Sequence, residues 1–166
     1  MTLAIISLGI LLTYTVGVCF YSRRIPNSLS QSVFELKGAQ ILFWYVGIIV
    51  PLMLIAPVLI EVTFEPYRWI AFLASVGLLF VGGAPLVHDK KEMAYKVHTA
   101  GAIVCALSAQ VLLLLSCWYL LLLWIPYVVV FVAKGGSLWR TKVFWAEMVC
   151  FLNTYAYCIY RKMCLG

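Results

Sequence analysis

Long apolar stretches recur along the whole chain and are separated by short polar segments. Most of these stretches approach about 20 residues, the length that an α-helix needs to cross the hydrocarbon core of a membrane. The pattern predicts an all-α fold, namely a polytopic transmembrane helix bundle of about six spans. A single integral membrane domain is expected over residues 1–166, with spans at 3–21, 41–60, 69–87, 97–115, 119–133 and 143–160.

Two features within the apolar stretches refine this layout. The stretch 101–133 is 33 residues long, which is too long for one span at about 1.5 Å per residue. A turn is therefore expected inside it, and residues 116–119 (Ser-Cys-Trp-Tyr) combine the polar and interfacial side chains that suit one. Pro51 and Pro57 are expected to kink the second span, because proline lacks an N–H and crowds the preceding turn.

The composition agrees with a membrane protein. Of the 166 residues, 65% are hydrophobic and only 11% are charged, and so few charges cannot cover the surface of a soluble domain. The six cysteines are scattered, mostly inside apolar runs and without a CxxC pair, which favours single buried thiols over disulfides or a zinc site. The N-terminal stretch lacks a basic n-region and a clear cleavage site, so it is interpreted as a retained first span.

The basic residues predict the topology, and the net charge of +6 is attributed to this topology and not to nucleic-acid binding. The odd-numbered loops would carry nine Lys and Arg residues: Arg23, Arg24, Lys37, Lys90, Lys91, Lys96, Lys134, Arg140 and Lys142. The other side would carry three: Arg68, Arg161 and Lys162. This asymmetry places the odd-numbered loops in the cytoplasm and the N-terminus on the non-cytoplasmic side.

Both histidines of the chain lie in the polar segment 81–102, each near an expected helix end. His88 and His98 are ten residues apart across a turn, so together with Asp89 they could share a proton or hold a polar ligand. A metal or a haem is a further alternative, but zinc would require a third or fourth ligand. Ordinary interfacial histidines at helix ends are the simplest interpretation. No metal or cofactor is therefore predicted.

Glu147 is expected about one turn inside the last span. A carboxylate within the membrane is costly and is a functional candidate by default, although it could also reach the interface or pair with a loop lysine. Ser28 and Ser30 lie in the first loop without a neighbouring His–Asp pattern, so the sequence does not favour a nucleophile. The residues predicted to bind a ligand are His88, Asp89, His98, Glu147, Ser28 and Ser30.

Small residues follow one face of the third and fourth expected spans at helical spacing. Such faces let helices approach closely, so they predict a packing partner, which is either another helix of this chain or a second copy of it. The two faces are Ala71, Ser75, Leu78, Gly82 and Pro85, and His98, Gly101, Ala102, Cys105, Ala109 and Leu112.

The first loop contains Pro26-Asn27-Ser28-Leu29-Ser30, which resembles the Pro-x-Ser/Ile-Ser segment after the first span in the DRAM-like superfamily. That superfamily includes the damage-regulated autophagy modulators and a GPI-anchor lipid-remodelling protein. The Gly-rich end of the third span and the segment 98–102 (His-Thr-Ala-Gly-Ala) are also similar. The resemblance implies a six-helix membrane protein linked to lipid handling, and it gives weight to Pro26, Ser28, Ser30 and His98. It also implies a luminal first loop, whereas the charge count favours the cytoplasm.

These observations predict an integral membrane protein that binds or handles lipid in a cleft between helices. Membrane lipids are its expected partners, and nucleic acid is not. One alternative is a lipid-modifying enzyme that uses His98 and Asp89 in acid–base chemistry. Another is a small proton-coupled transporter built around Glu147. No catalytic residue is assigned from the sequence.

Overall fold

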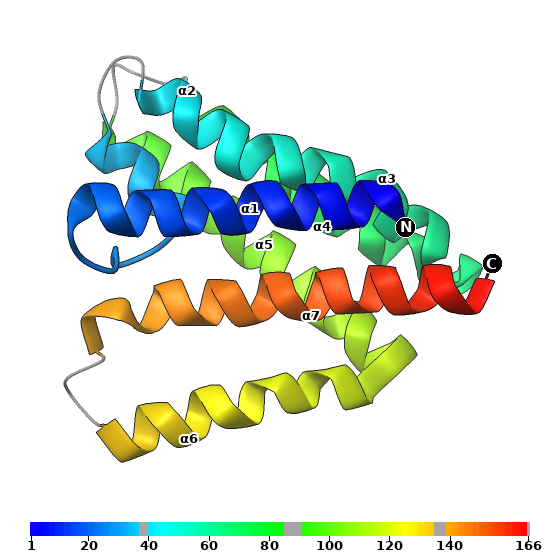
Figure 1. Ribbon diagram of the computed structural model, residues 1–166. Helices are drawn as coiled ribbons and strands as arrows, with labels where there is room; N and C mark the ends of the chain where they lie inside the picture. The colour runs from blue at the N-terminus through cyan, green and yellow to red at the C-terminus, as the bar shows by residue number, and fades with distance from the viewer. Residues whose placement is uncertain (37–39, 85–90, 135–138, 166) are drawn as a thin grey trace.

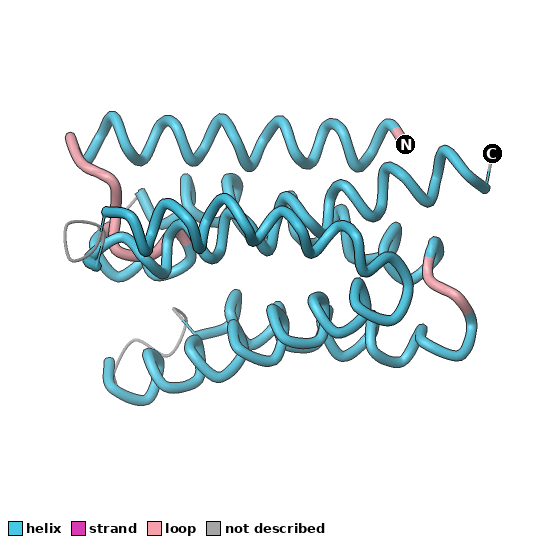
Figure 2. Tube along the Cα trace, turned by 90° about the horizontal axis from the view of Figure 1, so that it is seen from below, coloured by secondary structure: helices cyan, strands magenta, loops and turns pink. Residues whose placement is uncertain are grey.

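The computed structural model describes residues 1–36, 40–84, 91–134 and 139–165 of the chain. Within these ranges every regular element is helical and no strand occurs. The long helices run broadly along one common direction, and the loops between them lie at their ends (Figures 1 and 2). The all-α fold predicted from the spacing of the apolar stretches is therefore confirmed.

Eleven elements follow one another along the described residues. The first half of the chain contains α1 (Thr2–Ser22), the 3₁₀ helix η1 (Ser30–Glu35), α2 (Gln40–Trp44), the π turn η2 (Tyr45–Ile49) and α3 (Val50–Val62). After α3 come η3 (Glu65–Tyr67), α4 (Arg68–Gly83), α5 (Lys91–Cys117), η5 (Trp118–Leu123), α6 (Trp124–Lys134) and α7 (Lys142–Leu165).

Four helical runs within the described residues are long and apolar enough to cross a membrane: Thr2–Ser22, Gln40–Val62, Glu65–Gly83 and Glu92–Lys134. They are compatible with an integral membrane protein. The count of six spans is not confirmed. One reason is that α5, η5 and α6 form a single continuous helical run of 43 residues from Glu92 to Lys134, and another is that α7, which carries Glu147, is not among the four.

The long apolar run does change direction inside its length. α5 ends at Cys117, within the four residues expected for the turn, because Cys117 leaves the helical region with φ −154° and ψ 57°. η5 follows, and α6 then runs back towards the other end of the bundle (Figure 1). α6 has no buried residue and lies at the edge of the bundle.

The π turn η2 precedes Pro51, and it brings α1 close to the second helical run. Pro51 has no N–H and cannot donate to the carbonyl four residues earlier. Just before it, the Val50 N–H bonds to the Tyr45 carbonyl, five residues back, which is the π-helical pattern. Pro57 lies inside α3 without ending it. The ring of Tyr14 in α1 lies against Gly47, where a Cβ would stand only 2.0 Å from a ring carbon.

α4 and α5 pack most tightly, and glycines permit this. A Cβ on Gly77 would lie 2.6 Å from the Cys105 nitrogen, and one on Gly101 would lie 2.7 Å from the Gly77 carbonyl oxygen. The two backbones therefore touch without intervening side chains. The small face predicted for the fourth span therefore packs on another helix of this chain. The contact on α4 is Gly77, a residue that was not part of the face predicted for the third span. A second copy as partner stays a prediction.

Candidate functional site

The first loop turns back into the bundle and does not remain on the surface. α1 ends at Ser22, and the next residue, Arg23, adopts the left-handed conformation with φ 51° and reverses the chain. Ser28, Leu29, Ser30, Ser32 and Val33 are then buried, each at most 5% exposed. Such a polar segment can be buried only if its backbone and hydroxyl groups find partners.

Three helices supply hydrogen bonds to this loop. The Tyr14 hydroxyl of α1 bonds with the Ser32 hydroxyl at 2.8 Å. The indole N–H of Trp44 in α2 donates to the Ser30 carbonyl at 3.0 Å. The Phe144 N–H at the start of α7 donates to the Asn27 carbonyl at 3.1 Å. Residues 27–32 are thereby fixed against one end of the bundle.

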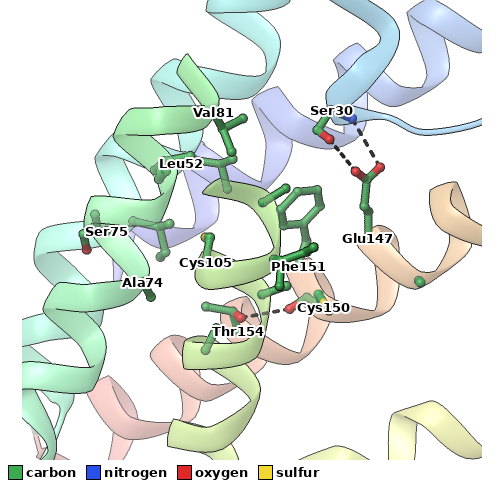
Figure 3. Close-up of a pocket in the computed structure, with 18 of the residues that line it drawn as sticks. Ser30, Leu52, Ala74, Ser75, Val81, Cys105, Glu147, Cys150, Phe151 and Thr154 are labelled. Atoms are coloured by element: carbon green, nitrogen blue, oxygen red, sulfur yellow. Dashed lines mark hydrogen bonds between the residues drawn. The ribbon is translucent and has the colours of Figure 1, made fainter. Parts of the chain in front are cut away.

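Glu147 of α7 binds the same loop through both carboxyl oxygens (Figure 3). Its Oε1 accepts from the Ser28 hydroxyl at 2.9 Å and is also in hydrogen-bond contact with Ser30 Oγ. Its Oε2 accepts from the backbone N–H groups of Leu29 at 2.5 Å and Ser30 at 3.2 Å. Four groups of the loop thus satisfy the oxygens of Glu147 within the bundle, and no ion pair joins it to a lysine among the described residues.

His98 of α5 approaches Ser30 from the other side. The imidazole is fully buried, and its Nε2 lies 3.1 Å from Ser30 Oγ. Its Nδ1 lies 3.3 Å from the carbonyl oxygen of Val81 in α4, while the ring of Phe34 packs edge-on against it with centroids 5.4 Å apart. Ser30 Oγ therefore stands between an imidazole and a carboxyl group. Below, Ser28, Ser30, His98 and Glu147 are called the loop cluster.

A cavity of about 290 Å³ lies beside the loop cluster, between α3, α4, α5 and α7. Its polar end contains Ser30, Gln31 and Glu147, whereas most of its length is lined by apolar side chains such as Leu52, Ala74, Leu78 and Phe151 (Figure 3). Thr99 also lines it, and the Thr99 hydroxyl is a buried group without a hydrogen-bond partner among the described residues. Ser75, Thr154 and Tyr155 line it further along, and their hydroxyls bond to backbone carbonyls. The cavity is therefore mostly apolar, with the carboxyl group of Glu147 at one end.

A second, smaller cavity of about 150 Å³ lies next to the loop and shares Gln31 with the first. It is lined by Asn27, Ser28, Gln31, Phe34 and Tyr95, so polar and aromatic side chains share its surface. The loop cluster is thus flanked by two cavities, of which the second has the less apolar lining.

Four of the six predicted ligand residues come together here: Ser28, Ser30, His98 and Glu147. The other two, His88 and Asp89, lie in segment 85–90, outside the described residues. The contact between Ser30 and His98 could not be predicted from the sequence, because the two residues are 68 positions apart. Within the described residues, no group of three or more His, Cys, Asp or Glu side chains is arranged to hold a metal ion.

Three residues of the site were not predicted: Gln31, Thr99 and Val81. The sequence contains a signal for Val81 alone. Its carbonyl stands four residues before Pro85, which has no N–H to donate, so the helical partner of this carbonyl is missing from the outset. For Gln31 and Thr99 the sequence holds no comparable signal.

No protein-family model, curated protein or solved structure matches this chain. The residues of the site are therefore the basis on which a function can be proposed.

Proposed function

We propose that this chain is an integral membrane protein that binds one membrane lipid in the cavity between α3, α4, α5 and α7. The hydrocarbon chain of the lipid occupies the apolar length of the cavity, and its head group lies at the end formed by Ser30, Gln31 and Glu147. The observation that carries the proposal is a mostly apolar cavity with the carboxyl group of Glu147 at one end.

The two ends of the cavity match the two parts of a lipid. Ligand cavities are mostly apolar and place a few polar groups where they orient the ligand. Here Ser30, Gln31 and Glu147 lie at the loop end, and the Thr99 hydroxyl is available for a hydrogen bond. The hydroxyls of Ser75 and Thr154 elsewhere in the lining already donate to carbonyls of their own helices. The second cavity adds space beside that end, with the polar side chains of Asn27, Ser28 and Gln31 in its lining for a head group.

The surroundings of the cavity support a lipid as the ligand. The four long apolar helical runs suit a chain within a bilayer, and large apolar side chains such as Phe72, Leu107 and Val132 are exposed on the outer faces of the helices. The resemblance of segments 26–30 and 98–102 to the DRAM-like superfamily points to lipid handling as well.

Filling the cavity tests the proposal. Ala106 lines it, whereas Val104 lies on the same helix, is 38% exposed and does not line it. In detergent-purified protein, we expect Ala106→Phe to weaken binding of a fluorescent fatty-acyl amphiphile at least about tenfold, which corresponds to about 1.4 kcal/mol. Val104→Phe should bind like the wild type. The proposal fails if a folded Ala106→Phe variant binds as tightly as the wild type.

Cysteine protection gives an independent measurement in the unmodified chain. Cys105 and Cys150 line the cavity, while Cys164 is exposed near the end of α7. A monoacylglycerol should slow alkylation of Cys105 and Cys150 by a small thiol reagent and leave Cys164 unaffected, as read by peptide mass spectrometry. Equal rates with and without the lipid would contradict occupancy of this cavity.

A further inference from the structure

Ser30 has the surroundings of an activated nucleophile. Its hydroxyl oxygen lies 3.1 Å from Nε2 of His98, and the residue borders the cavity proposed to hold a lipid chain. Nucleophilic serines are recognised by a base within hydrogen-bond reach and a third group that orients that base. Here the third group is the Val81 carbonyl, 3.3 Å from Nδ1 of His98.

The Val81 carbonyl determines the tautomer of His98. It can only accept a hydrogen bond, and Pro85 cannot supply the helical one. Nδ1 of His98 therefore carries a proton and donates to it. In a neutral imidazole Nε2 is then an acceptor that faces Ser30 Oγ, which is the arrangement that a general base requires.

The number of available protons indicates which group donates in the contact between Ser30 and Glu147. Three contacts meet at Ser30 Oγ: with His98 Nε2, with Glu147 Oε1 and, at 3.3 Å, with the Ser28 hydroxyl, which itself donates to Glu147. A hydroxyl supplies only one proton, so Ser30 cannot donate to both His98 and Glu147. If Ser30 donates to His98, the contact with Glu147 needs a proton on Oε1. The loop cluster then has no net charge, which suits a site between apolar helices. Glu147 acts as a positioning residue that holds Ser30 through the loop backbone.

We propose that Ser30 is the nucleophile of an ester hydrolysis whose substrate is a lipid ester with its acyl chain in the cavity; this inference rests on the proposed function. Ser30 Oγ bonds to the ester carbonyl carbon while its proton moves to His98 Nε2. The ester C–O bond breaks, and the alcohol leaves with that proton, so that an acyl-serine remains. Water attacks the acyl carbon, gives a proton to His98, and the fatty acid leaves as Ser30 Oγ regains this proton.

An alkyl fluorophosphonate tests the nucleophile directly, because Ser30 Oγ would bond to phosphorus with loss of fluoride. The full chain in detergent should gain one adduct, mapped to Ser30 by peptide mass spectrometry. Ser30→Ala should gain none. His98→Gln should slow labelling about a hundredfold or more, as loss of a general base does. Ser22→Ala, which removes a hydroxyl outside the cavity, should label at the wild-type rate.

A purely structural loop cluster would not react, so the outcomes are distinct. No adduct on Ser30, an adduct on another residue, or a folded His98→Gln variant that labels at the wild-type rate would overturn the inference. Binding of the fluorescent amphiphile is measured on the same samples. Wild-type protein that binds the amphiphile without labelling refutes the nucleophile alone, whereas protein that neither binds nor labels refutes the proposed function as well.

Discussion

Two of the polar clusters buried among the described residues differ in kind. The loop cluster joins the first loop to α5 and α7 and contains an imidazole and a carboxyl group. The second, here called the hydroxyl cluster, consists of Ser7 of α1, Tyr155 of α7 and the Pro51 carbonyl of α3. The Ser7 hydroxyl donates to the Pro51 carbonyl at 2.5 Å and bonds with the Tyr155 hydroxyl at 2.5 Å. Tyr155 is eight residues after Glu147, about 12 Å further along α7.

The difference shows what burial of polar groups does and does not indicate. In the hydroxyl cluster the two hydroxyl groups donate their own protons, Tyr155 to Ser7 and Ser7 to the Pro51 carbonyl, so no additional proton is needed. These hydrogen bonds account only for the way α1, α3 and α7 are held together. In the loop cluster the contacts of Ser30 with both His98 and Glu147 require one further proton, and the groups concerned can exchange it. Shared protons, more than burial itself, separate a candidate reactive site from a structural one.

The largest effect is expected when the loop cluster loses its acceptor. Glu147→Leu leaves the Leu29 and Ser30 N–H groups and the Ser28 hydroxyl without their partner in the bundle. We expect a loss of about 3–5 kcal/mol in the free energy of unfolding. Denaturant titration in detergent, followed by far-UV circular dichroism, measures it, and an unfolding midpoint equal to that of the wild type would contradict the role of Glu147.

Removing the imidazole should have the next largest effect. His98→Leu places an apolar side chain in a fully buried position, but it leaves the Val81 carbonyl and the Ser30 hydroxyl each without one partner. The expected loss is about 2 kcal/mol. Thermal unfolding in detergent, with Val104→Leu as a control on the outer side of the same helix, would reveal it. Identical melting temperatures for the two variants would count against the hydrogen bonds of His98.

The hydroxyl cluster should tolerate the loss of a member. In Ser7→Ala the Tyr155 hydroxyl can still donate to the Pro51 carbonyl, which it already approaches to 3.4 Å. The expected loss in unfolding free energy is about 1 kcal/mol, with unchanged affinity for the fluorescent amphiphile. If this variant instead abolished amphiphile binding, the two clusters would not be separable as structural and functional.

The smallest effect is expected for Glu147→Gln, and it tests whether Glu147 is protonated in the loop cluster. Glu147→Gln supplies a carbonyl oxygen for the Leu29 and Ser30 N–H groups and an NH₂ group that donates to Ser30 Oγ, as a protonated carboxyl would. Its unfolding free energy should therefore lie within about 1 kcal/mol of the wild-type value. The same titration as for Glu147→Leu measures it, and a loss as large as in that variant would show that the carboxylate is ionised in the folded protein.

Local patterns in the sequence predicted much of the scaffold. The apolar stretches predicted helices without strands, and residues 116–119 contain the position where α5 ends. These features depend on neighbouring residues, so they can be read from composition and spacing. The number of spans is less accessible, because α7 combines apolar residues with Glu147, Asn153 and basic residues.

The sequence by itself determined that a few polar residues, among them Ser28, Ser30, His98 and Glu147, had to be accommodated in an apolar helical chain. Only the tertiary structure decided that they meet. Ser30 is 68 positions from His98 and 117 from Glu147, and the loop that carries it turns inward. The physical reason is that side chains so far apart are brought together by helix packing, here by the close approach of α4 and α5 at Gly77 and Gly101 and by the inward turn at Arg23. No local pattern encodes such a meeting.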